Sequence, residues 1–375
     1  MAPIAVRKKA IEPSDILIFL PDLRGGGAER IGLILGEEFL RAGCSVEFVL
    51  MQARGELLGE AEEQFAVHSL DCTRAREVPL KFARYLRERR PDALLAAMWP
   101  LTGIASIATR IAGSSTRLVA SEHNDFRLMP SIKGWERWGL KYFGRALYGR
   151  CDGIVAVSAG VADSLREVAG LPLERITVIH NPVRRFEPGE LTDDDCRLLS
   201  GWLESEIRLI AIGSLKQQKG FDVLLRSLAE LRERIDARLL ILGEGPLRGE
   251  LEALSRDLGV DRHVWLPGFR HNPSAFLQHA DVFILSSNWE GFGNVLVEAL
   301  AAGVSVVSTD CLSGPSEILE GGRYGTLVEV GDHASLARGI EASVFCPFNR
   351  DLLIERAASF SPERAAQKYL EMFEK

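Results

Sequence analysis

Two carboxylates, Glu290 and Glu298, stand eight positions apart on either side of a glycine-rich turn. Gly291 and Gly293 allow the backbone to approach a ligand closely. A helix that starts near Asn294 would direct unpaired N–H groups and the positive end of its dipole at an anion such as a diphosphate. Carboxylates accept hydrogen bonds from hydroxyl groups, and eight helical residues span roughly 12 Å, about the reach from a ribose past two phosphates to a sugar. The spacing therefore indicates a nucleotide-sugar site. The simpler alternative is a helix with a capping acid and a solvated glutamate.

Glycine-rich turns follow several other expected strands. Gly26 and Gly27 lie between the first strand and a helix, where their amides can touch phosphate, although such a turn is often only structural. Gly243 and Phe269 follow two later strands, and Phe269 would lie beside a base. The G-x-G-x-x-G spacing of dinucleotide-binding proteins is absent. The turns therefore favour a phosphate-containing ligand. The missing fingerprint argues against an NAD-dependent oxidoreductase.

Two side chains at strand ends have useful chemistry. Lys219 stands between a strand and the next helix, where a cation would meet a diphosphate, although an isolated lysine is more often a surface residue. His123 follows a strand end, where a pKa near neutrality is useful, and the alternative is a structural histidine. No D-x-D follows a strand, and Asp193 to Asp195 are expected to be solvated linker charge. No bound metal is therefore expected.

Composition favours an ordinary globular enzyme. The 375 residues exceed one typical core, and 46% are hydrophobic and 26% charged. Six scattered cysteines without a C-x-x-C pair argue against disulfides and structural zinc, which fits a reducing cytoplasm. Residues 1–15 lack the apolar core of a signal peptide. The net charge of −7 disfavours nucleic acid as a partner, while residues 1–183 are slightly basic.

Short apolar runs alternate with amphipathic segments throughout, which predicts α/β architecture with parallel sheets. The first series of expected strands covers 16–20, 46–50, 93–97, 118–120, 154–157 and 177–179, and the second covers 208–212, 238–242, 264–266, 282–285 and 304–307. The polar stretch 184–205 reads as a linker. We therefore expect two doubly wound, Rossmann-like domains, 1–183 and 184–360, that face each other across a cleft at the strands' carboxyl ends. A last helix, 361–375, is expected to pack back on the first domain.

Segment 131–150 mixes aromatic residues with cations. Its members are Lys133, Trp135, Arg137, Trp138, Lys141, Tyr142, Arg145, Tyr148 and Arg150, beside one acid, Glu136. Such a mixture suits an anionic membrane surface or a lipid-linked acceptor. The alternative, which is slightly favoured, is a helix packed by Trp138 and Tyr142 with a solvated basic face.

Taken in order, these motifs resemble family-4 retaining glycosyltransferases of the GT-B fold over nearly the whole chain. The matching stretches are 25–30, 157–161, 179–183, 219–222, 242–245 and 290–298. Glu-x7-Glu is the most specific of them. Stretches 26–30 and 313–319 further resemble enzymes that build capsule, O-antigen, exopolysaccharide or lipid-linked oligosaccharide.

The resemblance implies a role for each matching residue. Glu298 would hold the ribose hydroxyls, and Glu290 the hydroxyls of the transferred sugar. Lys219 would neutralise the leaving diphosphate, and His123 would contact the sugar near the reacting carbon. The remaining donor-binding residues are Gly26, Gly27, Gly213, Ser214, Gly243, Phe269, Gly291, Phe292, Gly293, Asn294 and Val295. Many members of the family carry arginine where this chain has Ser214, so Lys219 would work with less help or Lys216 would substitute.

The expected activity is transfer of a sugar, with retention and without metal or other cofactor, from a nucleotide-sugar, taken to be UDP-linked. The acceptor would be a saccharide or a polyprenyl-diphosphate-linked saccharide of bacterial surface glycan synthesis. The chain would be cytoplasmic, with contact at the inner face of the membrane left open. No carboxylate is clearly placed to attack the sugar, which favours front-face displacement. The alternatives are a catalytically inactive GT-B partner subunit and a GT-B nucleotide-sugar epimerase.

Overall fold

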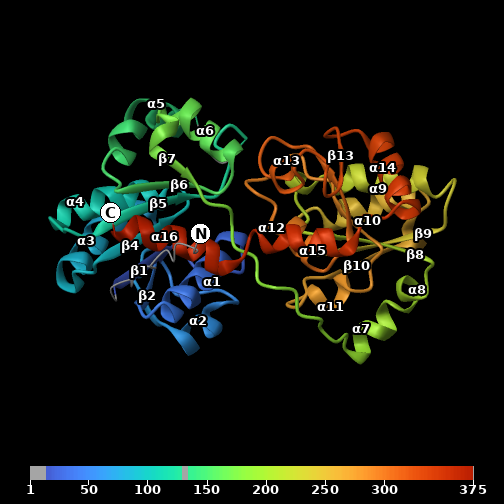
Figure 1. Cartoon of the computed structure of the whole chain (residues 1–375), viewed down its shortest axis with the longest axis horizontal. Helices are drawn as coiled ribbons and strands as arrows, with labels where there is room; N and C mark the ends of the chain where they lie inside the picture. Colours follow the sequence, from blue (N-terminus) through green and yellow to red (C-terminus); the bar gives the residue numbers. More distant parts are fainter. Residues whose placement is uncertain (1–13, 129–133, 375) are drawn as a thin grey trace, which may run out of the picture.

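The computed structural model describes residues 14–128 and 134–374, and it contains two parallel sheets, each covered by helices on both faces (Figure 1). Within the described residues, the N-terminal sheet has seven strands in the order β3-β2-β1-β4-β5-β6-β7. Their bounds are β1 Asp15–Leu20, β2 Ser45–Leu50, β3 Ala66–Ser69, β4 Ala93–Ala97, β5 Arg117–Glu122, β6 Gly153–Ala156 and β7 Ile176–Val178. The expected doubly wound, two-domain fold is confirmed.

The C-terminal sheet has six strands in the described part of the chain, in the order β10-β9-β8-β11-β12-β13. They are β8 Ile207–Ile212, β9 Ala237–Leu242, β10 Val264–Gly268, β11 Val282–Leu285, β12 Ser305–Thr309 and β13 Thr326–Val328. In both sheets the first strand along the chain lies inside the sheet and the strand order reverses beside it. A reversal of this kind opens a crevice at the carboxyl ends of the strands, where ligands bind.

Helices connect the strands of each sheet. Those of the N-terminal half are α1 Gly27–Arg41, α2 Leu58–Gln64, α3 Val78–Arg89, α4 Leu101–Ala112, α5 Gly134–Tyr148 and α6 Ala159–Ala169. Those of the C-terminal half are α9 Phe221–Leu231, α10 Arg248–Asp257, α11 Ser274–Leu277, α12 Asn294–Ala301, α13 Pro315–Ile318, α14 His333–Phe345 and α15 Arg350–Ala358. The interior strands are almost wholly buried, as strands covered on both faces must be.

The sequence prediction missed two edge strands, β3 and β13. They have four and three residues, and most of their side chains are half-buried. Short edge strands carry little of the hydrophobic pattern that marks a buried strand, because one side of an edge strand stays open. These two strands are recognised only by their pairing with a neighbouring strand, which the sequence does not display.

The expectation of an irregular linker was wrong in its middle part. Residues 193–203 form two short helices, α7 Asp193–Leu198 and α8 Ser200–Leu203. The hydroxyl of Thr192 caps α7, and Asp195 is buried, binding Arg270 at 2.9 Å instead of facing solvent. A capping residue followed by acids in the first turn is a helix-start pattern, which the polar composition concealed.

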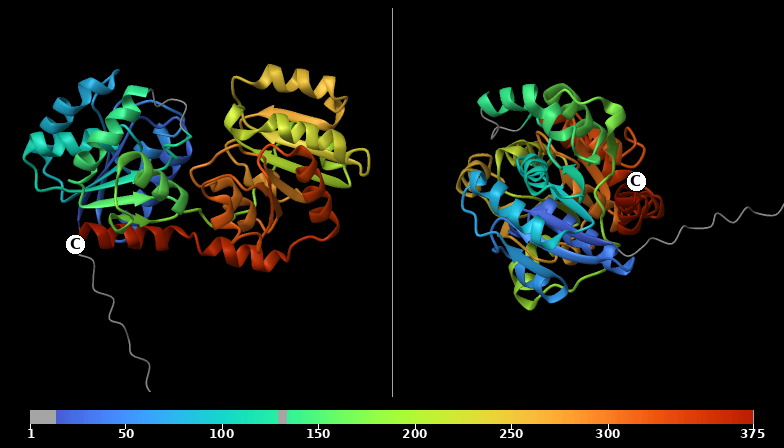
Figure 2. Two further views of the ribbon diagram at one scale, coloured as in Figure 1. Left: turned by 90° about the horizontal axis from the view of Figure 1, so that it is seen from above. Right: turned by 90° about the vertical axis from the view of Figure 1, so that its left-hand side faces the viewer.

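The chain ends in α16, Pro362–Glu374, which lies against the N-terminal half. Figure 2 shows α15 and α16 running along one side of both halves. Tyr369 and Phe373 of α16 are buried in the N-terminal core, and the hydroxyl of Tyr369 lies 2.9 Å from the Oγ of Ser121. The two halves are therefore connected twice, once after β7 and once before α16.

Candidate active site

Lys219 and Glu290 form an ion pair at the carboxyl end of the C-terminal sheet. Lys219 ends a short 3-10 turn before α9, and Glu290 follows β11. The Lys219 Nζ donates to Glu290 Oε1 at 2.6 Å, and the Ser287 Oγ donates to the same oxygen at 2.7 Å. Both side chains of the ion pair are largely buried, at 17% and 8% exposed. The structure thus brings together two of the predicted residues. It adds Ser287, which no sequence motif singled out.

The glycine turn before α12 works partly as predicted. The helix begins at Asn294, and its N-cap residue, Gly293, has φ +101°, a left-handed conformation that favours glycine. Of the two carboxylates only Glu298 belongs to the helix, so the roughly 12 Å length of eight helical residues does not describe the separation between Glu290 and Glu298. Phe292 is buried, and its ring stacks on His180 at 5.3 Å between centroids.

Glu298 and Asn294 lie one turn apart on α12 and line a cavity of about 240 Å³ between the halves. Arg30 of α1 lines the same cavity from the other side. Burial raises the pKa of Glu298, and the positive charge of Arg30 offsets only part of this effect. A half-buried carboxylate that lines a cavity is well suited to accept hydrogen bonds from a neutral diol.

His123 meets the C-terminal half at Gly291. A Cβ atom at position 291 would lie 1.9 Å from the carbonyl oxygen of His123, so only glycine allows this approach. The His123 Nε2 lies 3.1 Å from the Ser121 Oγ, and its Nδ1 is buried and finds no partner among the described residues. Burial lowers the pKa of His123 to about 4, so the expectation of a pKa near neutrality was wrong. The imidazole is neutral at pH 7 and can donate or accept one hydrogen bond toward a ligand.

Glu122, the residue before His123, was not predicted. Its carboxylate is fully buried and accepts hydrogen bonds from the Thr102 hydroxyl at 2.6 Å, the Tyr148 hydroxyl at 2.6 Å and the backbone N–H of Trp99 at 3.0 Å. Burial nevertheless raises the pKa of Glu122 to about 7. Glu122 directly precedes His123 in the sequence, but nothing in the sequence showed which helices would cover its side chain.

Gly26 and Gly27 begin α1 directly opposite α12. Gly26 is the N-cap residue of α1, and a Cβ at position 27 would lie 3.3 Å from the Nδ2 of Asn294. The carboxylate of Glu29 folds back on Gly26, and burial raises its pKa. The glycine turn therefore reaches the start of α12, as a diphosphate site shared by both halves requires.

The remaining predicted residues lie at neighbouring strand ends. Gly213 packs against the aliphatic part of Lys219. A Cβ at position 213 would lie 3.0 Å from the Cε of Lys219, so a side chain there would displace the lysine. Gly243 has φ +148° and lies against the carbonyl of Gly213. Ser214 and Lys216 are exposed. Phe269 is 39% exposed and meets His271 edge to face at 5.0 Å.

A wider hollow of about 590 Å³ is bordered by Cys311, which lies close enough to Glu290 and Lys219 to feel their charges. Leu128 of the N-terminal half and Asn288 and Asp310 of the C-terminal half also border it. Burial raises the pKa of the Cys311 thiol to about 12, and the nearby charge of Glu290 adds to this effect. The hollow thus lies near Glu290 and offers polar side chains to a sugar.

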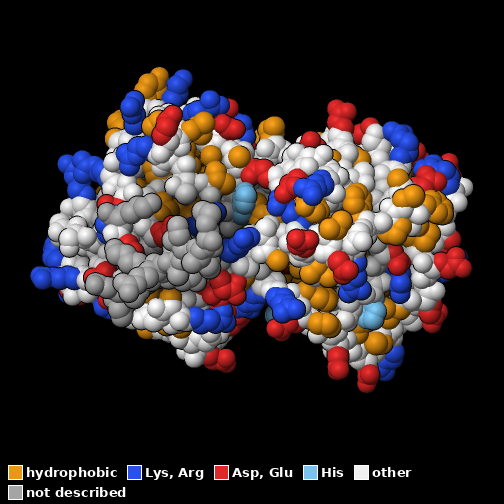
Figure 3. Space-filling view, viewed as in Figure 1, with side chains coloured by type: hydrophobic (Ala, Val, Ile, Leu, Met, Phe, Trp, Pro, Cys, Tyr) orange, Lys and Arg blue, Asp and Glu red, His pale blue; other side chains and the backbone are white. Residues whose placement is uncertain are grey.

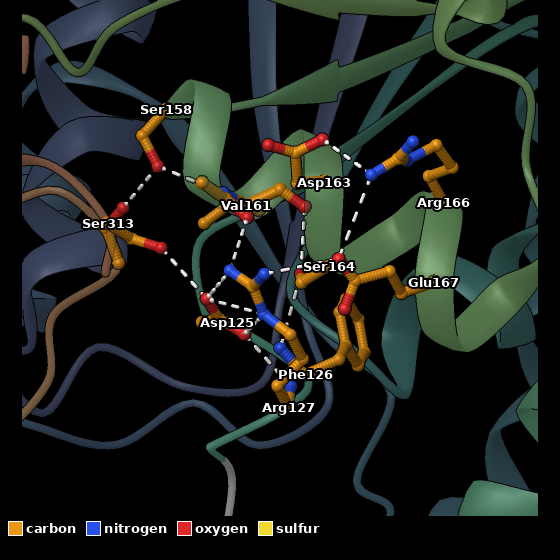
Figure 4. A network of polar contacts seen from close by, with 12 residues as sticks. Asp125, Phe126, Arg127, Ser158, Val161, Asp163, Ser164, Arg166, Glu167 and Ser313 are labelled. Carbon is orange, nitrogen blue, oxygen red and sulfur yellow. Dashed lines mark hydrogen bonds and ion pairs between the residues drawn. The ribbon is translucent and has the colours of Figure 1, made fainter.

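Hydrogen bonds join the two halves around the site. Figure 4 shows the network that includes Asp125, Arg127 and Ser158 of the N-terminal half and Ser313 of the C-terminal half. Ser313 donates to Asp125 at 2.9 Å, and Ser158 donates to the carbonyl of Gly291 at 2.7 Å. The closed arrangement holds His123 against the turn that carries Glu290.

A second contact between the halves involves Glu317 of α13. Its carboxylate accepts the backbone N–H groups of Ala159 at 2.9 Å and Gly160 at 3.3 Å, at the start of α6, and lies 3.2 Å from the Nε2 of His180. Burial opposes ionisation, but these hydrogen bonds outweigh it and lower the pKa of Glu317. A carboxylate from one half therefore caps a helix of the other.

The basic aromatic segment lies at the top of the N-terminal half. Residues 131–133 of this segment lie outside the described part of the chain. So do residues 1–13, which belong to the start that was expected to lack a signal peptide. Trp138, Tyr142 and Phe143 are 55–59% exposed, whereas Leu140 and Tyr148 are buried. The alternative of a helix packed by Trp138 and Tyr142 was therefore wrong. Figure 3 shows hydrophobic and basic side chains together in this region.

No helix in the described ranges is long and apolar enough to cross a membrane. Within the same ranges, no three His, Cys, Asp or Glu side chains are grouped as metal ligands.

Comparison with known proteins gives the family. A model described as "Glycosyltransferase Family 4" matches residues 25–185, and one described as "Glycosyl transferases group 1" matches residues 206–344. The lipopolysaccharide core biosynthesis glycosyltransferase LpsE of Rhizobium meliloti is 31% identical over 93% of this chain and 96% of its own length. A Campylobacter jejuni N-acetylgalactosaminyltransferase, whose name gives a diphospho-undecaprenol-linked acceptor, is 29% identical over 86% of this chain and 88% of its own length.

Solved structures agree on the fold. A glycosyltransferase from Rickettsia africae superposes with a TM-score of 0.80 over 96% of this chain and 98% of its own, at 19% identity. HepE of Anabaena, solved in complex with UDP, superposes with a TM-score of 0.78 over 95% and 98%, at 21% identity. At such identities the likeness establishes the GT-B fold alone. With the two family models and a full-length relative above 30% identity, the chain belongs to glycosyltransferase family 4.

Proposed function

We propose that this glycosyltransferase moves a sugar from a UDP-linked donor to a saccharide acceptor carried on polyprenyl diphosphate, in the synthesis of a bacterial surface glycan. The observation that carries the proposal is the Lys219–Glu290 pair, which lies close to Cys311 at the border of the hollow and precedes the start of α12. The cation would stabilise the leaving diphosphate, and the carboxylate would bind hydroxyls of the transferred sugar.

The choice of a UDP-linked donor has indirect support. HepE, which has the same fold, was solved with UDP and with UDP-glucose. In this chain the cavity between α1 and α12 would offer Glu298 to a ribose, and the amides at the start of α12 would bind the adjoining phosphates. Ser214 lacks the positive charge common in the family, so Lys219 would carry most of the leaving-group stabilisation.

The proposed transfer retains the anomeric configuration without a covalent sugar–enzyme intermediate. Glu290 is assigned to hydroxyls of the transferred sugar, and its Oε1 also accepts a hydrogen bond from Ser287. Front-face displacement, in which the leaving phosphate stays beside the incoming hydroxyl, needs no enzyme nucleophile. Neutral His123 would bind the sugar near the reacting carbon, and Lys219 would replace a metal ion as the source of positive charge.

The acceptor assignment draws on relatives and on the surface of α5. The Campylobacter enzyme acts on a diphospho-undecaprenol-linked sugar according to its name. The exposed Trp138, Tyr142 and Phe143, with Lys141 6.0 Å above the Tyr142 ring, suit contact with an anionic membrane. We expect peripheral attachment at the inner face of the membrane.

The test is a transfer assay with a panel of UDP-sugars and a polyprenyl-diphosphate-linked saccharide, in the presence and absence of a chelator. We expect UDP release that depends on the acceptor, survives the chelator and yields a product with the donor's anomeric configuration. An inactive partner subunit would release no nucleoside diphosphate, and an epimerase would convert the donor without an acceptor.

A further inference from the structure

Two arginines beside the first glycine turn share one buried carboxylate. Arg24 follows β1, Arg54 follows β2, and the Nε atoms of both bind the Oδ2 of Asp22, at 2.8 and 3.2 Å. The Asp22 side chain is only 3% exposed, whereas the two arginines are 67% and 51% exposed. Because both guanidinium groups bind the same oxygen atom, they lie next to each other.

The two loops that carry the arginines are joined through their backbones. The N–H of Leu23 donates to the carbonyl of Arg54 at 2.9 Å, and the N–H of Leu57 donates to the carbonyl of Leu23 at 3.0 Å. Gly55 has φ +121°, and a Cβ there would lie 2.1 Å from the carbonyl carbon of Leu23. The approach of the loops is therefore fixed, and the arginines keep their relative positions.

The free edges of the guanidinium groups are available to a ligand. Asp22 occupies the Nε atoms, and the Nη groups of Arg24 and Arg54 find no partner among the described residues. A guanidinium fork binds phosphate through two parallel N–H···O bonds. Two adjacent forks match two adjacent phosphate groups. The acids nearby are the buried Glu29 and the exposed Glu56, whose carboxylate lies beside Gly25.

The arginine pair and His123 lie at the carboxyl ends of strands of the same sheet. The arginines follow β1 and β2, and His123 follows β5. The strand order places β4 between β1 and β5, so the ends of β1 and β5 are roughly 10 Å apart at the usual strand spacing. A diphosphate at the arginines would therefore lie about two strand spacings from a sugar that reacts near His123. Gly27, three residues after Arg24, reaches Asn294 of the other half.

We propose that Arg24 and Arg54, held side by side by Asp22, form a binding site for a diphosphate group. The diphosphate belongs either to a lipid-linked acceptor or to the leaving group of the donor. Identification of the source rests on the proposed function, whereas the site itself does not.

The first measurement is calorimetric titration with inorganic pyrophosphate. We expect the double variant Arg24→Gln with Arg54→Gln to bind pyrophosphate at least about tenfold more weakly than the wild type. Arg74→Gln with Arg76→Gln removes two exposed arginines of the same half and serves as the matched control, with unchanged binding. Equal loss in both variants, or no loss in either, would overturn the proposal. If the double variant is unstable in a melting experiment, Arg54→Gln alone retains the Arg24–Asp22 pair and is compared instead.

The second measurement identifies the source. If the diphosphate is the acceptor's, the double variant raises the KM for a diphosphate-linked acceptor but not for the same saccharide as an alkyl glycoside, and its affinity for UDP is unchanged. If it is the donor's, UDP affinity falls and the two acceptors respond alike. A wild-type enzyme that transfers no sugar would contradict the proposed function and leave the pyrophosphate result standing.

Discussion

Gly291 of the C-terminal half lies so close to His123 of the N-terminal half that a Cβ at position 291 would be 1.9 Å from the histidine's carbonyl oxygen. The contact joins the turn that carries Glu290 to the strand end that carries His123. The chemistry proposed here therefore depends on how closely two backbones from different domains approach.

Gly291→Ala should weaken catalysis without unfolding either half. The added methyl group must push the halves apart, and misplacement of reacting groups by about 1 Å can cost roughly 100-fold in rate. We expect a fall of that order in kcat/KM, with the melting temperature nearly unchanged. Gly249→Ala is the control, because nothing lies within 4 Å of a Cβ at that helical position. Full activity in Gly291→Ala would show that the closed contact is not needed.

Lys219→Ala should lower turnover more than donor affinity, because negative charge on the diphosphate grows as the bond breaks. Loss of one such electrostatic contact typically costs about 100- to 1,000-fold in kcat. Steady-state kinetics separate kcat from KM. Lys216→Ala, an exposed neighbour, should have little effect. A raised KM with unchanged kcat would mean that Lys219 only holds the donor.

Glu298→Ala should weaken binding of UDP. Each hydrogen bond from a ribose hydroxyl to a charged group contributes about 1.5–3 kcal/mol, so a loss of one to two such bonds is expected. Calorimetry with UDP measures the change, and Glu233→Ala on the surface provides the comparison. Unchanged UDP affinity would exclude the ribose role.

Glu122 and His123 should have opposite effects on stability over nearly the same pH range. Burial raises the pKa of Glu122 from 4.5 to about 7, so the folded state holds an extra proton there and stability falls as pH rises between these values. Burial lowers the pKa of His123 from 6.5 to about 4, so the unfolded state binds the proton and stability rises with pH over that interval.

Denaturant unfolding at pH 4.5 to 7 separates the two effects. In the wild type they partly cancel. Glu122→Gln should leave a free energy of unfolding that rises with pH, and His123→Asn should leave one that falls with pH, each by at most a few kcal/mol. Parallel pH profiles in the two variants would contradict the burial of both groups.

Lys141→Glu with Arg145→Glu should reduce binding to anionic vesicles. Each cation near an anionic bilayer contributes about 1 kcal/mol, and the attraction is screened by salt. Co-sedimentation of the wild type with anionic, but not neutral, vesicles should be reversed by high salt. Arg256→Glu with Arg262→Glu makes the same charge change in the C-terminal half and should bind like the wild type. Identical sedimentation of all three proteins would show that α5 does not contact membrane.

The sequence predicted best the features that depend on local pattern. Apolar runs located most of the interior strands, and the glycines around position 292 located the start of α12 at Asn294. The sequence prediction failed where burial or strand formation depends on contacts between segments far apart in the chain. Asp195 of α7 is buried where it binds Arg270, which follows β10. Strand β13 forms by pairing with β12.

The candidate site shows the same division. The sequence singled out Lys219, Glu290 and His123, but their relationship across the cleft needed the structure. The low pKa of His123 results from burial, which its position in the sequence does not reveal. Its Nε2 meets the hydroxyl of Ser121, which in turn contacts Tyr369 of the last helix, almost 250 positions away. Ser287 and Glu122 carried no motif. Only the structure shows that Ser287 binds Glu290 and that Glu122 is buried beside Trp99, Thr102 and Tyr148.

A structure of the complex with UDP tests the central claim most directly. The account predicts that the ribose hydroxyls bind Glu298, that the β-phosphate lies at the start of α12, and that the Lys219 Nζ moves from Glu290 to a phosphate oxygen. UDP bound elsewhere, or bound while the 2.6 Å Lys219–Glu290 contact stays intact and distant from phosphate, would contradict it.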